Sequence, residues 1–385
     1  MISGPKSPHY AEAMTSQRSQ ARSTTMQKDD VPEIGSDFEL VKGKYLIPTK
    51  SRRLPWEGAA AITYVESGRQ ALTLVQTELH RQGHTHLHVP SYLCDSMISP
   101  FKNDLWTLTG LPVDSDLAVR PADLLSRVFD GVLLHAPYFG RQDSPAMLDT
   151  LDTLRRRGVV VVVDETHRVF AGPSPVADIR VGSLRKLLPV YDGGYVTGLS
   201  GQFRPSLQTL QSTAAALRQM AMRAKSAALA SGDGSKAHLA LSASAAHATE
   251  VRTEPVRMSE ESLSLLHHLN MELIQETREL NSISLDQALG SSDRFRVINA
   301  PTEDLLPSHL VLETDEVTAL RQYLIDRRIY CPIHWPPSEL LRRTRTWPNR
   351  YISLPIDHRY NEPDMLRMAA CVRTFFGKNQ KDFNT

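Results

Sequence analysis

Five consecutive valines, Val159–Val163, are followed directly by Asp164, and they constrain the fold more than any other stretch. A run that is apolar at every position has no exposed face, so it predicts a strand that is covered on both sides. Such strands occur inside parallel α/β sheets, where helices cover both faces. Ligands in these folds bind at the carboxyl ends of the strands, and Asp164 stands at such an end.

Other short apolar stretches alternate with helical ones through this half of the chain. Strands are predicted at His84–Val89, Gly131–His135, Asp178–Gly182 and Gly193–Gly198, and a helix with apolar spacing at residues 147–154 precedes the valine run. The strand–helix–strand order predicts right-handed parallel crossovers and therefore a mostly parallel, doubly wound sheet.

The last third of the chain has a different order of elements. Ser259–Leu289 is predicted as one long helical stretch that leads into a strand at His309–Leu312 and a helix at Val317–Arg327. The segment Ile329–Trp335 and a final helix at Met365–Phe375 follow. This order predicts a smaller, compact α+β domain at the C-terminal end.

We therefore predict three regions. Residues 1–32 have few large apolar residues and are expected to be a disordered tail. A large α/β domain is expected over 33–285 and a small α+β domain over 286–385. Within the large domain, 205–250 are rich in Ala, Gln, Arg, Lys and Ser, which predicts helices with a mobile break at 232–234.

Composition excludes several classes of protein. The net charge is +1 at pH 7, so no overall field favours nucleic acid or a membrane surface. The three cysteines are too few and too far apart for a disulfide framework, which indicates a reducing compartment. No apolar run is long enough to span a membrane, and the N-terminus lacks a signal-peptide core. The sequence thus predicts a cytoplasmic protein.

Three alternating histidines, His84, His86 and His88, raise the question of a metal site. Alternation places all three on one face of the predicted strand. No carboxylate lies near them in the sequence, so a half-exposed strand face is the favoured interpretation, and no metal site is predicted.

Ser67 and Gly68 mark the start of a helix, because apolar residues recur at helical spacing from Arg69 onward. Ser67 is a suitable N-cap, and a glycine at the next position lets a ligand approach the backbone. A helix N-terminus suits a phosphate, although an ordinary capped helix has the same sequence features.

Six segments in a fixed order carry a resemblance to a known family. They are Ser67–Leu72, Val89–Phe101, His135–Gly140, Val163–His167, Gly182–Gly194 and His334–Trp335. From about residue 33 onward the chain resembles the pyridoxal 5′-phosphate (PLP)-dependent aminotransferases of the DegT/DnrJ/StrS type. The resemblance implies the aspartate-aminotransferase fold, also called PLP fold type I.

The resemblance implies two catalytic residues. Lys186 matches the lysine that forms the Schiff base with PLP, because an amine can act as nucleophile and later carry a proton. Asp164 matches the acid beside the pyridine nitrogen, where a carboxylate keeps that nitrogen protonated.

The remaining cofactor and substrate positions also follow from the resemblance. Cofactor contacts are expected from Ser67, Gly68, Arg69, Tyr92, Cys94, His135, Asp164, His167, Ser183 and Lys186. Cys94 aligns with a position that often holds a stacking aromatic, so Tyr92 or His135 is expected to cover the ring instead. Substrate contacts are expected from Arg185, Tyr138, His334 and Trp335, although Arg185 equally fits a solvated position and Trp335 a packed one.

One position departs from the family pattern. Sugar aminotransferases of this type commonly have an Asn where this chain has Pro255, and that Asn reaches the partner subunit's cofactor phosphate. Pro255 has no side-chain donor, so the usual contact between subunits and the usual sugar-nucleotide substrate are both open questions.

These features predict a homodimeric aminotransferase with a shared active site, which moves an amino group from an amino acid donor to a keto acceptor. The acceptor is a keto sugar or an intermediate of specialised metabolism. Two alternatives stay open: a PLP-dependent lyase, racemase or carbon–carbon bond-forming enzyme, and a non-catalytic descendant of the family. Retention of both Lys186 and Asp164 argues against the second.

Overall fold

The computed structural model describes residues 31–51, 53–58, 60–199, 205, 207–208, 212–232, 236–302, 305–335 and 350–378. All but two residues of the predicted tail, 1–32, lie outside this part of the chain. None of the helices among the described residues is long and apolar enough to cross a membrane.

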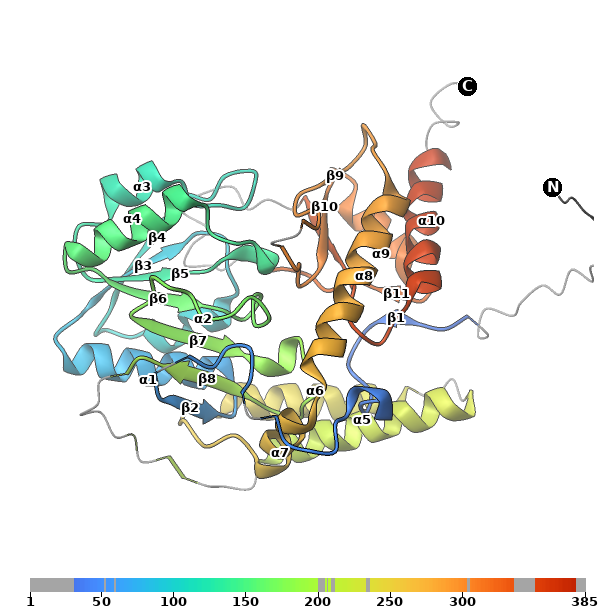
Figure 1. Ribbon diagram of the computed structural model, residues 1–385, viewed down its shortest axis with the longest axis horizontal. Helices are drawn as coiled ribbons and strands as arrows, with labels where there is room; N and C mark the ends of the chain where they lie inside the picture. The colour runs from blue at the N-terminus through green and yellow to red at the C-terminus, as the bar shows by residue number, and fades with distance from the viewer. Residues whose placement is uncertain are drawn as a thin grey trace, which may run out of the picture.

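A seven-stranded sheet forms the centre of the larger domain, with the strand order β2-β8-β7-β6-β5-β3-β4 (Figure 1). The strands are β2 (Ile62–Val65), β3 (His86–Pro90), β4 (Thr107–Leu111), β5 (Val132–His135), β6 (Val160–Asp164), β7 (Ile179–Ser183) and β8 (Gly194–Thr197). Among the described strands of this sheet, β8 alone is antiparallel to the other six. The prediction of a mostly parallel sheet is confirmed.

The valine run forms β6, between β5 and β7. Val162 packs with the side chains of α1 (Gly68–Arg81) on one face. Val161 and Val163 pack with those of α4 (Pro145–Arg156) on the other, where α3 (Pro121–Arg127) also lies. Alternate valines therefore serve opposite helical layers, which is why no polar residue interrupts the run.

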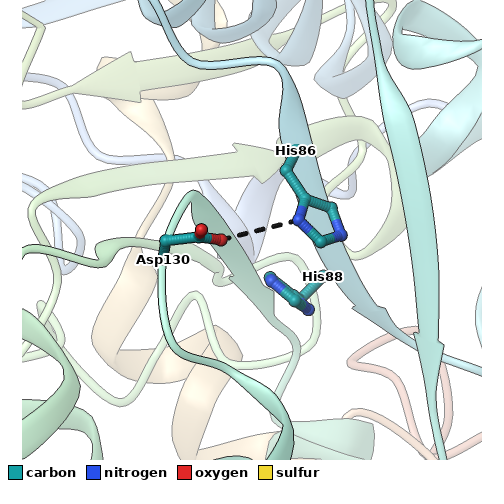
Figure 2. A group of neighbouring side chains, drawn as sticks. All are labelled: His86, His88 and Asp130. Atoms are coloured by element: carbon teal, nitrogen blue, oxygen red, sulfur yellow. Dashed lines mark ion pairs between the residues drawn. The ribbon is translucent and has the colours of Figure 1, made fainter.

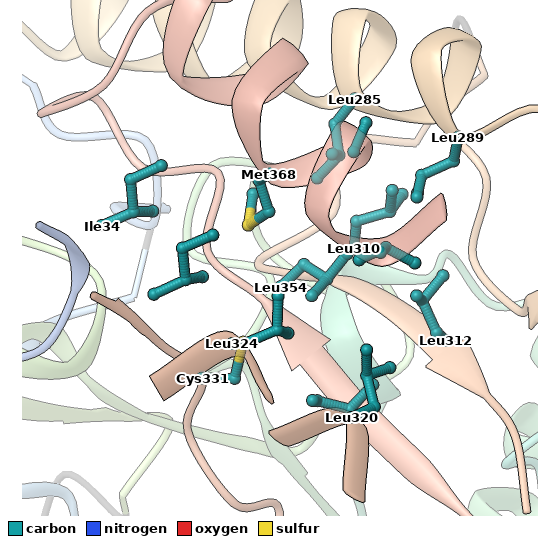
Figure 3. Packing of buried hydrophobic residues seen from close by; sticks show 14 of the residues in the cluster. Ile34, Leu285, Leu289, Leu310, Leu312, Leu320, Leu324, Cys331, Leu354 and Met368 are labelled. Atoms are coloured by element: carbon teal, nitrogen blue, oxygen red, sulfur yellow. The ribbon is translucent and has the colours of Figure 1, made fainter. Parts of the chain in front are cut away.

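The smaller domain has its own hydrophobic core (Figure 3). A three-stranded antiparallel sheet of β9 (Arg296–Val297), β10 (Leu310–Glu313) and β12 (Tyr351–Leu354) packs with α8 (Met271–Leu289), α9 (Val317–Ile325) and α10 (Glu362–Lys378). The N-terminal strand β1 (Ile34–Gly35) pairs with β11 (Ile329–Tyr330), and Ile34 is buried in this core. The chain thus enters the smaller domain first, although residue 34 lies within the predicted range of the large one.

The predicted single helix over Ser259–Leu289 is wrong, because the structure has two helices there. α7 (Glu260–His268) is followed by Leu269, whose backbone is extended, and α8 begins at Met271. Asn270 separates them, because its side chain accepts a hydrogen bond from the N–H of Leu273 and so caps a new helix.

Two helices form the predicted helical region between 205 and 250. α5 (Thr213–Ser231) and α6 (Ala237–Val251) lie side by side below the sheet in the view of Figure 1. α5 ends at Gly232, whose φ of 68° favours glycine. Residues 233–235, two of which belong to the predicted break at 232–234, lie outside the described part of the chain.

The interpretation of the three histidines is also wrong in two respects. His88 is buried rather than half-exposed, with 2% of its surface accessible. A carboxylate does lie nearby: Asp130 Oδ1 is 3.6 Å from His86 Nδ1. Sequence proximity could not show this, because Asp130 comes from the loop before the neighbouring strand β5.

Candidate functional site

The carboxyl ends of β6 and β7 bring Asp164 and Lys186 to one place. Asp164 ends β6, and one of its carboxylate oxygens accepts a hydrogen bond from the N–H of Thr166, 2.8 Å away. Lys186 ends a short 3-10 helix, Leu184–Lys186, which follows β7 directly. Both side chains line one small cavity, as their positions in the sequence predict.

A buried polar network supports the turn after Asp164. Glu165 is 1% exposed and accepts hydrogen bonds from the Arg180 guanidinium at 3.2 Å and the Tyr195 hydroxyl at 2.8 Å. Its other oxygen accepts from the N–H of Ser174. The Tyr195 ring lies over Gly182, where an added Cβ would come within 2.4 Å of it. These contacts hold the backbone next to Asp164 in place.

The small cavity is nearly filled. Its volume is about 20 Å³, and its lining residues are Met97, Ala136, Pro137, Tyr138, Asp164, Thr166, His167, Lys186 and Trp335. That volume holds about one water-sized sphere. A six-membered ring can therefore enter beside Asp164 only when one wall moves, and Trp335 is the wall that comes from the smaller domain.

His167 belongs to a cluster of three aromatic rings with Phe139 and Trp335, whose own centroids are 6.0 Å apart. The Phe139 ring centroid is 5.1 Å away and the Trp335 centroid 5.6 Å away, both near-parallel to the imidazole. Its Nδ1 accepts a hydrogen bond from the Phe139 N–H, so the ring proton belongs on Nε2. Burial holds the pKa of His167 well below its usual range, and the nearby ammonium of Lys186 adds to this.

An arginine cluster lies near the N-terminus of α1. Within the described part of the chain, Arg69 Nε, Arg185 Nε and Arg218 Nη2 are buried and have no hydrogen-bond partner. Burial lowers the pKa of Arg185 to about 10; the charges of Arg218 and Arg69 act in the same direction, and those of Asp37 and Asp192 oppose them. Arg69 also lies 4.0 Å from the Glu250 carboxylate. Buried cations with unused donors favour a bound anion.

Ser67 and Ser183 lie at the same helix end. The Ser67 hydroxyl caps α1 by accepting from the N–H of Gln70. A Cβ on Gly68 would come within 2.9 Å of the Ser183 Cβ, so the close approach at this glycine is made by Ser183. The helix N-terminus and two hydroxyls thus complete a site that suits a phosphate.

A second, larger cavity of about 420 Å³ opens on the other side of Lys186. It is lined by both domains, including Ser36, Asp37, His167, Arg278, His309, His334, Asp357 and Arg359. Lys186 and His167 line both cavities, so the two spaces meet at the lysine.

Arg278 is the unusual side chain of the larger cavity. It is 1% exposed and donates one hydrogen bond, from Nη2 to the carbonyl of Ser308. Its Nε and Nη1 are buried without a partner among the described residues. Burial lowers the pKa of Arg278 to about 10, so it remains a cation at neutral pH. A guanidinium with two unused donors beside a cavity is suited to a carboxylate.

Two other charges of this cavity are paired with each other. Arg359 donates to both oxygens of Asp357, at 2.7 and 2.9 Å. Although burial favours the neutral acid, Arg359 holds the pKa of Asp357 well below its usual range. Burial, with Arg278 nearby, lowers the pKa of His309 to about 3. The walls therefore present a neutral imidazole, the ion pair of Arg359 with Asp357, and the cations Arg278 and Lys186.

Three residues expected beside the ring make other contacts in this structure, and their contacts with a cofactor stay predictions. Tyr92 is buried, its hydroxyl donates to the His334 carbonyl, and its ring packs near those of Tyr138 and Trp335. Cys94 precedes α2 (Asp95–Ile98), with its sulfur 3.0 Å from the Ser96 hydroxyl. His135 Nε2 is 2.7 Å from an Asp143 carboxylate oxygen. None of the three is in the lining of the described cavities, whereas Tyr138 and Trp335 are.

Sequence reasoning missed Arg278 and Arg218, and only the first had a readable signal. Arg278 follows Met271 and Ile274 and precedes Leu285 at the spacing of the buried face of α8. An arginine in an apolar stripe must either be paired or await a ligand. Arg218 lies on a helix whose apolar face is weak, so its position near Arg185 depends on tertiary packing.

No family model and no curated protein matches the sequence. Solved structures do match its fold. The aminotransferase TlmJ from Streptoalloteichus hindustanus has a TM-score of 0.58 and 17% identity, over 82% of this chain and 86% of that one. Spr1654 from Streptococcus pneumoniae, solved in a PLP form, has a TM-score of 0.59 and 14% identity, over 82% and 87%.

A DegT DnrJ EryC1 StrS aminotransferase from Brucella abortus has a TM-score of 0.53 and 15% identity, over 82% of this chain and 85% of that one. At such identities the likeness concerns the path of the backbone. It agrees with the mixed seven-stranded sheet and the smaller C-terminal domain. The chain therefore has the aspartate-aminotransferase-like fold of these enzymes, PLP fold type I, as the sequence resemblance implies.

Proposed function

We propose that the chain is a PLP-dependent aminotransferase that takes an amino group from an amino acid and gives it to a keto acceptor. The observation that carries this proposal is that Lys186 lines two cavities, one beside Asp164 and the other beside Arg278. The arginine cluster lies at the start of α1. A cofactor phosphate would match the arginine cluster in charge, and a substrate carboxylate would match Arg278.

The donor groups of this chain fit PLP. Ser67, Gly68 and Ser183 would hold its phosphate, with Arg69, Arg185 and Arg218 supplying the charge. Asp164 would hold a proton at the ring nitrogen, and neutral His167 would donate from Nε2 to the ring hydroxyl. When bound, the cofactor supplies an electron sink for the bonds at the substrate α-carbon.

Lys186 would perform two tasks through its Nζ. It would hold the cofactor covalently before substrate arrives, and it would then move a proton from the substrate α-carbon. Arg278 would orient the substrate by its carboxylate, because its two free donors can form a paired contact. Phe139, His167 and Trp335 would form an aromatic wall beside the cofactor ring.

The acceptor is proposed by analogy. Proteins that share this fold are described as sugar aminotransferases, CalS13 from Micromonospora echinospora being one. A keto sugar, or a keto intermediate of specialised metabolism, is therefore the class of acceptor to test first.

We also propose a homodimer. Met220, Leu229, Leu239 and Val251 on α5 and α6 are exposed apolar residues, and a partner subunit would cover such a surface. Light scattering on purified protein measures this directly, and a monomer at micromolar concentration would contradict it.

The main test combines a spectrum with product analysis. Wild-type protein with PLP should show the visible band of the lysine-bound cofactor, and an amino acid donor should bleach it. Amino-group transfer from a labelled donor to a keto acid should then be detectable. Lys186→Ala should abolish the band and lower transfer by at least about 100-fold, the lower end of what a positioned proton-transfer group contributes.

Lys236→Ala is the matched control, because Lys236 is an exposed lysine before α6. If Lys186→Ala kept the band and the transfer rate, the proposal would be wrong. If the wild type formed the band but released a cleavage product without transfer, a PLP-dependent lyase would replace it.

The nearly filled cavity beside Asp164 favours one other candidate, a non-catalytic descendant. In such a protein Trp335 would occupy the space of the ring permanently. Wild-type protein that formed no band at saturating PLP, while remaining folded, would support this second candidate.

A further inference from the structure

The cluster of His86, His88 and Asp130 lies away from Lys186, where β3 begins and where the chain enters β5 (Figure 2). One ligand atom from each residue lies within 4.8 Å of the others. His86 and His88 are two residues apart on one strand, so both point to the same face of the sheet. Asp130 approaches them from the loop between α3 and β5.

His88 is the strongest sign that a ligand is missing. It is 2% exposed, and neither ring nitrogen has a hydrogen-bond partner in the described part of the chain. Leaving a buried polar group unsatisfied costs about 1–3 kcal/mol.

His86 is already oriented by an outer partner. Its Nε2 is 2.8 Å from the hydroxyl of Thr109 on the neighbouring strand β4. When Nδ1, the atom that faces Asp130, binds an ion, Nε2 carries the ring proton and can donate it to this hydroxyl. Metal-binding histidines usually have such a partner on the second ring nitrogen.

The backbone holds Asp130 against β3. Gly131 has a φ of 75°, and a Cβ there would come within 2.7 Å of the His86 carbonyl oxygen. Only glycine allows this close approach at this φ. The turn therefore keeps the carboxylate beside the two imidazoles, although the Asp130 side chain itself is exposed.

We propose that His86, His88 and Asp130 bind a divalent transition-metal ion of the zinc type, with water completing the coordination. With metal–ligand bonds of about 2.0–2.2 Å, two ligands of a tetrahedral ion lie roughly 3.4 Å apart. The distance between His86 Nδ1 and Asp130 Oδ1, 3.6 Å, is close to this. Imidazole nitrogens favour zinc over magnesium or calcium.

Such an ion would join β3 to the loop before β5. Its site is at the amino ends of the parallel strands, whereas Asp164 is at a carboxyl end. The ion would therefore stabilise the large domain without contacting the proposed substrate. The inference is independent of the proposed function, because it holds whether or not the chain is an aminotransferase.

The test is a titration of chelator-treated full-length protein with Zn²⁺, followed by calorimetry and by the thermal midpoint. Co²⁺ is a second probe, because its visible absorption reports four-coordinate geometry. Wild type should bind one ion at this site and gain a few degrees in its midpoint at saturating metal. Mg²⁺ at the same concentration should produce neither effect.

Three variants test which residues determine the affinity for the metal ion. Asp130→Ala removes an exposed ligand and should weaken binding by more than the roughly 10- to 100-fold that loss of an outer partner costs. Thr109→Val, which removes only the outer hydroxyl, should weaken it by about 10-fold. His84→Gln is the matched control, since His84 is a neighbouring histidine outside the cluster, and it should bind as wild type.

Loss of tight binding in Asp130→Ala with His84→Gln unchanged supports the proposal. Absence of zinc binding by the wild type overturns it. Equal affinity in wild type and Asp130→Ala also overturns it, because the ion would then occupy another place.

Discussion

The two cavities beside Lys186 differ in volume and in the charged side chains that line them. The larger one has room, at about 420 Å³, and a buried guanidinium with two unused donors. The smaller one has the carboxylate of Asp164 in place but only about 20 Å³ of space, with Trp335 against one side. The larger cavity is thus open and the smaller one nearly filled, although Lys186 lines both.

This difference separates two costs of binding. Arg278 is held by α8 and by the Ser308 carbonyl, so a carboxylate would meet a donor that is already positioned. A ring beside Asp164 must first displace an aromatic side chain, and that rearrangement would lower its apparent affinity. Substitutions on each side should therefore change different measured quantities.

Replacing Arg278 should have the largest effect on the larger cavity. Arg278→Met should lower kcat/KM for the amino acid donor by roughly 10- to 100-fold, because a hydrogen bond to a charged group contributes about 1.5–3 kcal/mol. The cofactor spectrum should not change. Steady-state kinetics with varied donor, together with the unfolding midpoint, measures both effects.

Stability distinguishes this role from a structural one. Removing a buried cation with two unused donors should leave the free energy of unfolding unchanged or raised. Arg278→Lys should recover part of the donor affinity, and Arg373→Met, at an exposed arginine of α10, is the control. A destabilised Arg278→Met protein with normal donor kinetics would show that the residue is structural.

Trp335 should control the smaller cavity in the opposite direction. Trp335→Ala opens the wall beside Asp164, so PLP should bind roughly 10-fold more tightly if the open arrangement is a minor state of the wild type. Trp335→Phe should be intermediate. Stopped-flow absorbance measures association of PLP, and unchanged rates in both variants would mean that Trp335 already leaves the ring site free.

The smallest effect concerns the neutral histidines that line the larger cavity. Burial lowers the pKa of His167, His309 and His334, so each binds fewer protons when folded than when unfolded. Their contribution is complete above about pH 6.5 and is lost as the pH falls, by up to about 1.4 kcal/mol per pH unit for each group.

Urea unfolding at pH 7.5 and pH 5.5 measures this loss. His309→Asn should show a smaller difference between the two pH values than wild type, because one of the three buried titrating groups is gone. An equal difference in both proteins would mean that His309 is already charged in the folded state.

The sequence was sufficient to predict those elements and site residues that depend on neighbouring positions in the chain. The valine run and Asp164 predict a strand and its functional end, and Ser67 with Gly68 predicts a capped helix, because these depend on neighbouring residues only. It was insufficient where distant segments meet. Asp130 reaches His86 through a loop, and Asn270 divides a stretch whose apolar spacing continues on both sides.

The same reason explains which site residues were missed. Lys186 and Asp164 lie in ordered motifs, whereas Arg218 lies on a helix with no strong apolar face. The aromatic wall was anticipated only in part. Trp335 was expected near the substrate, but its stacking on His167 depends on how the smaller domain packs against the larger.

The pairing of β1 with β11 has a consequence for how the protein matures on the ribosome. Ile34 can pair with Ile329 only after residue 329 has emerged. Ser36 and Asp37, which directly follow β1, form part of the wall of the larger cavity. This wall of the cavity beside Lys186 therefore cannot form during synthesis until residue 329 has been translated. Such a distant closure is slow, and it makes the cavity one of the last parts of the molecule to be assembled.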